Sequence, residues 1–155
     1  MDKYNYNIEE IKKYMQFALA EAKKTARTNT ADVPVGCIIT DKDGNIIGKG
    51  YNTREQDGSV LGHAEINALE DARKKTGSYI LEGAFMYVTL EPCPMCAGAI
   101  AAARLDTVFY GASNTSNGAC GTVYNLLYPT VNVFGDICAE EASEILKTFF
   151  AKLRQ

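Results

Sequence analysis

Two short stretches restrict the fold of this chain more than any other feature of its sequence. They are His63-Ala64-Glu65, which contains the single histidine, and Pro92-Cys93-Pro94-Met95-Cys96. Because proline is tolerated in the first helical turn, we expect a helix to begin at Pro92 or just after it. The first stretch also precedes a helical pattern. Residues 66–91 leave room for a helix, a loop and a strand, so one fold can bring both helix N-termini together.

The spacing of apolar residues predicts the elements around these stretches. Helical spacing predicts helices over 7–27, from 64 to about 75, from 92 through the stretch AGAIAAA, and from 139 onward. Apolar runs predict strands over 33–40, 46–51, 84–89, 106–110 and 131–134. We expect a turn at DKDGN (41–45), a C-cap at Gly77, and polar loops over 52–62 and 111–121. Strands that alternate with helices favour one α/β domain over residues 1–155, with helices on both faces of a mixed sheet.

The composition bears on compartment and partners. No apolar run is long enough to span a bilayer, and the acidic opening MDKYNYNIEE does not fit a secretory signal. We therefore expect a cytoplasmic protein whose five cysteines are reduced, metal-bound or buried rather than paired. The formal net charge of −3 differs from the basic surface that is typical of nucleic-acid binders.

The residue types in the two stretches indicate a metal site. One imidazole and two thiolates suit Zn²⁺ at catalytic sites, where a fourth position stays open for water. Helix N-termini at the site would stabilise the thiolates of Cys93 and Cys96. Glu65, two residues after His63, is placed beside such a water rather than on the metal. A carboxylate there can move protons from water to substrate, a role that contributes about 10²–10⁴ in rate. The stretches thus predict zinc held by His63, Cys93 and Cys96, with Glu65 as the general acid–base.

The split pattern H-x-E…P-C-x-x-C resembles the signature of the cytidine deaminase-like zinc deaminases. From about Ala18 to the C-terminus the chain is most similar to the bacterial tRNA adenosine deaminases, which convert wobble adenosine to inosine. The segments that carry this resemblance are VPVG at 33–36, YNTRE at 51–55, HAEINAL at 63–69, YVTLEPCPMCAGAI at 87–100, GACGTVYNLL at 118–127 and FFAKLRQ at 149–155. It implies a three-layer α/β/α sandwich with a mixed five-stranded sheet, one zinc ion per subunit, a homodimer, and a tRNA anticodon arm as partner.

The same resemblance implies the substrate contacts. Asn52 would hydrogen-bond the target nucleotide, the backbone at Ala64 would contact the base edge, and Val33 and Pro34 would form part of the pocket wall. The chain departs from the tRNA enzymes at Asn114, where they usually carry an aspartate that contacts the nucleotide backbone or ribose. Its C-terminal helix is also poorer in arginine. The alternative substrate is therefore a small free base or nucleoside, such as guanine, cytosine or cytidine.

The residues taken alone leave other interpretations open. Cys93 and Cys96 could form a redox pair, or a structural zinc site closed by Cys37 or Cys120 in a protein without turnover. The adjacent acid Glu65 argues against a closed site, which has no use for it. Asn52 follows a strand and could instead form a turn by bonding local backbone, and Asn114 could do the same in its loop.

Overall fold

One mixed sheet organises the computed structural model, which describes residues 6–28 and 30–155. Its order is β2-β1-β3-β4-β5. The strands are β1 (Gly36–Thr40), β2 (Ile46–Tyr51), β3 (Phe85–Leu90), β4 (Thr107–Ala112) and β5 (Asn132–Phe134), and the helices are α1 (Ile8–Ala26), α2 (Arg54–Asp57), α3 (Ala64–Thr76), α4 (Pro94–Ala102) and α5 (Ala139–Leu153). Strand β1 runs antiparallel to β2 and β3, whereas β3, β4 and β5 are parallel. The prediction of a mixed five-stranded α/β fold is confirmed.

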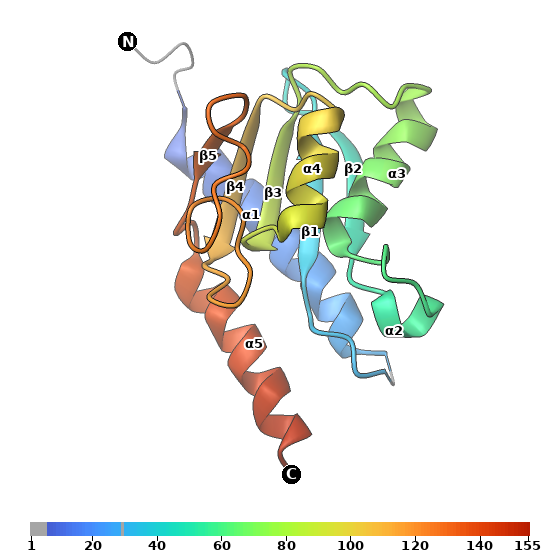
Figure 1. Ribbon diagram of the computed structural model, residues 1–155, viewed down its shortest axis with the longest axis vertical. Helices are drawn as coiled ribbons and strands as arrows, with labels where there is room; N and C mark the ends of the chain where they lie inside the picture. The colour runs from blue at the N-terminus through green and yellow to red at the C-terminus, as the bar shows by residue number, and fades with distance from the viewer. Residues whose placement is uncertain (1–5, 29) are drawn as a thin grey trace.

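Helices cover both faces of this sheet and bury a separate apolar core on each. Figure 1 shows α3 and α4 in front of the strands and α1 behind them. Successive side chains of a strand point to opposite faces, so the strands divide their apolar residues between the two cores. Cys37 and Ile39 pack on the α3 and α4 face, while Ile38 and Tyr87 pack with α1 and α5. This division produces the three-layer α/β/α sandwich.

Strand β1 begins later than the apolar run predicted. The run starts at residue 33, but the strand starts at Gly36. Pro34 has no N–H to donate to a ladder, so the segment before Gly36 cannot pair regularly. Instead, the carbonyl of Val33 accepts a bond from the side chain of Asn52, and that of Val35 accepts one from the Asn52 N–H. These bonds turn the segment toward the end of β2.

The loop predicted over 52–62 contains the short helix α2. Its N-terminus is capped from outside the loop, because the Asp32 carboxylate accepts bonds from the N–H groups of Glu55 (2.6 Å) and Gln56 (3.1 Å). Such a distant cap leaves no local sequence signal. Helix α4 begins at Pro94, slightly later than Pro92. No helix in residues 6–28 and 30–155 combines the length and apolarity needed to cross a membrane.

Helix α3 packs so closely on β2 that the backbones of the two elements are in contact. This contact fixes where the helix begins. A Cβ added at Gly50 would lie 2.4 Å from the carbonyl oxygen of Ala64. Ala64 stands between His63 and Glu65, so a side chain at position 50 must displace both. We expect Gly50→Ala to lower the free energy of unfolding by about 1–3 kcal/mol, measured by urea denaturation, and to reduce turnover.

The matched control for this prediction is Gly98→Ala on α4. Gly98 is exposed, and a Cβ there meets no atom within 4 Å. Because alanine is a better helix former than glycine, this variant should be neutral or more stable by up to about 1 kcal/mol. Equal losses of stability in the two variants would contradict close packing at Gly50.

Candidate active site

The two motif stretches meet where helices α3 and α4 begin. Figure 1 shows these helices side by side, both starting at the same end of the sheet. His63 is the N-cap residue of α3, Cys93 is the N-cap residue of α4, and Cys96 lies in the first turn of α4. Neither N-cap side chain bonds its own helix. Both side chains are therefore available to a ligand at the helix N-termini.

The donor atoms of these three residues fit a zinc ion. His63 Nδ1 lies 3.6 Å from Cys93 Sγ and 3.6 Å from Cys96 Sγ, and all three atoms lie within 4.8 Å of one another. Zn–S bonds of about 2.3 Å and Zn–N bonds of about 2.0–2.1 Å at tetrahedral angles require an N···S separation of about 3.6 Å. Within the described residues neither Cys37 nor Cys120 joins the cluster. A closed site with either as fourth ligand is therefore wrong, and a zinc ion held by these three atoms would have a fourth position left for water.

Hydrogen bonding within the cluster shifts the pKa values of its members. A hydrogen bond from the Cys96 thiol, assisted by His63, lowers the pKa of Cys93 to about 4. Donating that bond raises the pKa of Cys96, and burial raises it further. The bond to Cys93 also raises the pKa of His63, against the opposing effect of burial. A metal ion bound by these atoms would take the place of the shared protons, since thiolates are the ligating form.

Glu65 is held next to the cluster without belonging to it. It lies in the first turn of α3, is 4% exposed, and is hydrogen-bonded to the Cys96 side chain. Burial raises the pKa of its carboxyl above the usual range, partly offset by hydrogen bonds to its own backbone N–H and to Cys96. A zinc ion held by the three donor atoms would therefore have a buried carboxyl group as its neighbour.

A cavity of about 190 Å³ opens beside these groups. It is smaller than the ligand pockets of about 300–1,000 Å³ that hold drug-sized molecules, which suits a single base. Its lining includes Val33, Asn52, Ala64 and Asn114, four of the five positions predicted to contact substrate. Pro34 is not part of it and lines a different cavity, together with residues of α5.

Two asparagines face the cavity while also bonding their own loops. Asn52 donates from Nδ2 to the Val33 carbonyl (2.9 Å) and accepts at Oδ1 from the Arg54 N–H (3.0 Å). Asn114 accepts at Oδ1 from the N–H groups of Ser116 and Asn117, each at 3.2 Å, and donates to the Asn117 side chain (2.8 Å). The turn-forming role is thus present at both positions, and their nucleotide contacts remain predictions.

Sequence reasoning missed three polar or charged residues that line the cavity, Arg54, Glu91 and Asn117, as well as the apolar Val35 and Leu90. Arg54 begins α2 and is exposed, so it places a positive charge at the cavity. Glu91 is buried and directly precedes the metal-ligand turn, which is the segment 92–96 that contains Cys93 and Cys96. A charged residue between a buried strand and a metal ligand is unusual, and this signal could have identified Glu91. Asn117 stands among small polar loop residues and carries no such signal.

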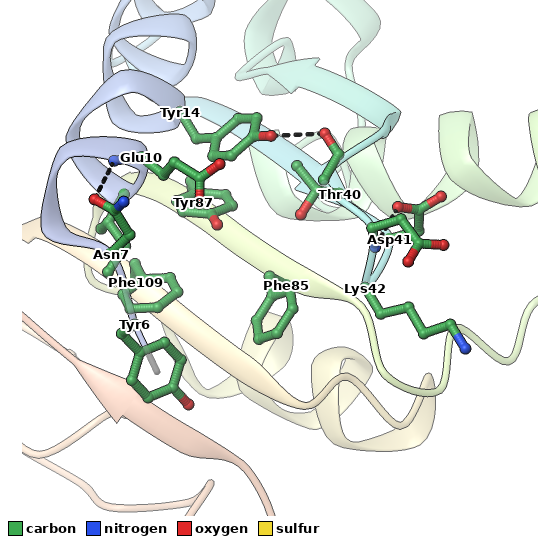
Figure 2. A pocket seen from close by; sticks show the side chains of 13 residues that line it. Tyr6, Asn7, Glu10, Tyr14, Thr40, Asp41, Lys42, Phe85, Tyr87 and Phe109 are labelled. Atoms are coloured by element: carbon green, nitrogen blue, oxygen red, sulfur yellow. Dashed lines mark hydrogen bonds between the residues drawn. The ribbon is translucent and has the colours of Figure 1, made fainter. Parts of the chain in front are cut away.

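A second cavity, of about 370 Å³, is separate from this site. Figure 2 shows the rings of Tyr14, Phe85 and Tyr87 around it, with Glu10 and Asp41 beside them. It lies at the start of α1 and the β1–β2 turn, and none of the predicted site residues lines it. The chemistry indicated by the sequence is therefore confined to the cavity beside the three ligand atoms.

Three donor atoms that fit zinc, with a buried carboxyl group beside them, are the arrangement that a zinc-dependent hydrolytic deaminase requires. The family model of the cytidine and deoxycytidylate deaminase zinc-binding region matches residues 8–112, and the chain belongs to this family. The matched range includes His63, Glu65, Cys93 and Cys96. The fold, the zinc ion and the class of reaction that the sequence predicted are thereby confirmed.

Within this family, the chain is similar to several proteins that are named tRNA-specific adenosine deaminases. The tRNA-specific adenosine deaminase of Streptococcus pyogenes serotype M18 (strain MGAS8232) is 39% identical over 155 residues, 97% of this chain and 96% of that protein. The protein of the same name from Bacillus subtilis (strain 168) is 39% identical over 147 residues, 92% of this chain and 89% of its own length. A structure from a study of A-to-I editing by tRNA deaminases at the wobble position has a TM-score of 0.79 at 35% identity, covering 86% of this chain and 99% of the other.

Proposed function

We propose that this deaminase converts adenosine to inosine at the wobble position of a tRNA. The observation that carries the proposal is the 190 Å³ cavity, in which His63, Cys93 and Glu65 face a space of the size of one base, with Cys96 Sγ buried behind them. Further support is the 39% identity to tRNA-specific adenosine deaminases over nearly the full length of both chains. A base inside a folded anticodon arm would have to leave its stack to enter this cavity.

In the proposed mechanism, His63 Nδ1 and the thiolates of Cys93 and Cys96 hold zinc. When bound, zinc supplies the Lewis acidity that makes water a nucleophile at neutral pH. Glu65 takes a proton from the attacking water at its carboxylate and passes it to ring nitrogen N1 as oxygen adds to C6. It then takes the proton of the hydroxyl added at C6 and passes it to the exocyclic amine, so the C6–N bond breaks, ammonia leaves and C6 becomes a carbonyl. The burial of Glu65 keeps bulk water away from these transfers.

The walls of the cavity would hold the base in place for this chemistry. Val33 supplies an apolar wall, and the backbone at Ala64 lies beside Glu65, where it can meet the base edge. Asn52 and Asn114 would contact the nucleotide with the hydrogen-bonding capacity that their turns leave free. A carbonyl oxygen has two lone pairs, so Asn52 Oδ1 can accept a second bond while it holds Arg54.

We also propose that the protein is a homodimer and acts in the cytoplasm, where tRNA is found. Exposed apolar side chains support the dimer. Val60 (69% exposed) and Leu61 (56%) precede His63, and Leu126 (51%) and Tyr128 (77%) follow Cys120. Exposed large apolar side chains can mark an interface between chains where they gather into one surface. Sedimentation equilibrium should give twice the chain mass of 16.9 kDa.

The proposed substrate is tested by an ammonia-release assay on zinc-loaded protein. The substrates are an anticodon stem-loop with wobble adenosine, the same stem-loop with wobble guanosine, and free guanine, adenine, cytosine and their nucleosides. We expect turnover of the adenosine stem-loop alone, with inosine at the wobble position. Because phosphate contacts release counterions, binding of the stem-loop should weaken steeply as salt rises from about 50 to 200 mM.

Turnover of a free base or nucleoside, with the stem-loop untouched, would contradict the tRNA proposal. The protein would then be a small-molecule deaminase, and Asn114 would be a residue to exchange first. Bound zinc without turnover of any of these substrates would contradict the proposed activity altogether.

A further inference from the structure

We propose that Glu91 is a positioning residue, which holds the loop over residues 113–122 against the metal-ligand turn and so sets the width of the substrate cavity. The inference rests on the proposed function, because it assigns Glu91 to substrate binding at the same site. It concerns a residue that neither ligates the metal nor moves a proton in the mechanism above.

The carboxylate of Glu91 is buried and is bonded entirely to this loop. Glu91 is 1% exposed, and no cation is among its partners within the described residues. Its Oε1 accepts from the Asn114 N–H (3.2 Å) and from the Thr122 hydroxyl. Its Oε2 accepts from the N–H groups of Cys120 (3.0 Å) and Thr122 (3.2 Å). One side chain thus pairs three backbone N–H groups from both ends of the loop.

Backbone bonds join the same loop to the same turn. The Ala119 N–H donates to the Pro92 carbonyl (2.8 Å), and the Glu91 N–H donates to the Ala112 carbonyl (2.9 Å). Pro92 directly precedes the ligand Cys93. These backbone bonds therefore fix the position of the loop relative to the predicted metal ligands. Glu91 adds side-chain hydrogen bonds to the same contact.

The loop forms one wall of the cavity. Asn114 and Asn117 line it together with His63 and Cys93. The metal ligands are positioned by helices α3 and α4, whereas the two asparagines are positioned by the loop. Loss of the Glu91 bonds should consequently move the substrate wall and leave the ligand cluster in place. This predicts a defect in substrate binding with zinc retained.

The first test variant is Glu91→Gln, which keeps the shape of the side chain. One acceptor oxygen becomes an NH₂ group, a donor that faces the loop's N–H donors, so buried hydrogen bonds are lost. We expect one zinc ion per chain, a KM for the wobble stem-loop that rises about 10- to 100-fold, and a kcat within about threefold of the wild type.

A second variant disturbs the same contact without changing Glu91. A Cβ added at Gly118 would lie 2.6 Å from Glu91 Oε2 and 2.6 Å from the Asn114 carbonyl oxygen. Gly118→Ala must therefore displace the carboxylate or the loop, and we expect the same rise in KM. If Glu91→Gln does not fold, Gly118→Ala decides the question.

The matched control is Asp41→Asn in the β1–β2 turn. Asp41 is also a carboxylate that organises a loop, since it accepts from the N–H groups of Asp43 and Asn45 at 2.9 Å and from the Asn45 side chain at 3.0 Å. It does not line the substrate cavity. We expect this variant to lose stability while its KM stays at the wild-type value.

Hydrogen exchange gives a readout that does not depend on the substrate. Amides of the 113–122 segment should exchange faster in Glu91→Gln and Gly118→Ala than in the wild type or Asp41→Asn. If the wild type turns over a free base instead of the stem-loop, the proposed function fails, and the KM for that base still tests Glu91. The proposal would be overturned if Glu91→Gln and Gly118→Ala both kept the wild-type KM and the wild-type rates of amide exchange. Loss of zinc from Glu91→Gln would also overturn it.

Discussion

Replacing Glu65 by alanine is expected to lower kcat/KM by about 10²–10⁴ while zinc stays bound. Glu65 is the buried carboxyl that adjoins the open coordination position, but it is not among the three ligand atoms. Its removal takes away the group that moves protons between water, ring nitrogen and leaving amine. The metal ligands stay on α3 and α4. Kinetics with the wobble stem-loop and zinc analysis on the same preparation measure both effects.

The control for this prediction is Glu70→Ala on the same helix. Glu70 is 54% exposed and pairs with Arg73 at 2.8 Å, so its loss should change stability by no more than about 0.5 kcal/mol and leave activity unchanged. Undiminished turnover by Glu65→Ala would contradict the proton-transfer role. Loss of zinc from that variant would show instead that Glu65 supports the metal site.

Much of the fold could be predicted because its signals are local. Alternating or continuous apolar runs identified the five strands, and helical spacing identified α1, α3, α4 and α5. Gly77 was predicted as a C-cap, and it has the left-handed φ of 76° that favours glycine there. Helix α2 was missed because its cap, Asp32, lies outside the loop that forms it. Contacts between distant segments leave no periodic pattern.

The candidate site likewise has one part that local sequence signals predict and another part that only the packing of distant segments brings together. The three predicted ligands and Glu65 lie in two stretches with fixed internal spacing, so residue types and spacing indicated a zinc site and the resemblance to a known signature indicated its chemistry. Glu91 acquires its partners from a loop more than twenty residues further along the chain, and Arg54 and Asn117 reach the cavity only through the packing of their loops. Pro34 adjoins Val33 in sequence, yet only Val33 lines the cavity. Residues that are adjacent in sequence need not line the same cavity.

Replacing Cys93 by alanine is expected to remove both the metal and the stability that the metal provides. The variant keeps only His63 Nδ1 and Cys96 Sγ from the cluster, and two ligands do not hold zinc as three do. At free zinc about a thousandfold above Kd, a bound ion stabilises the native state by about 4 kcal/mol. Elemental analysis should therefore find little zinc in Cys93→Ala, and thermal denaturation should find a lower Tm than in the wild type.

A chelator separates this loss from ordinary damage to the core. It should lower the Tm of the wild type toward that of Cys93→Ala and leave the variant unchanged, because the variant has no metal to lose. Cys138→Ala is the control, since Cys138 is half-buried at the start of α5 and outside the cluster, so it should keep its zinc and respond to the chelator as the wild type does. A Cys93→Ala protein with one zinc per chain would contradict the ligand assignment and place the metal on other residues.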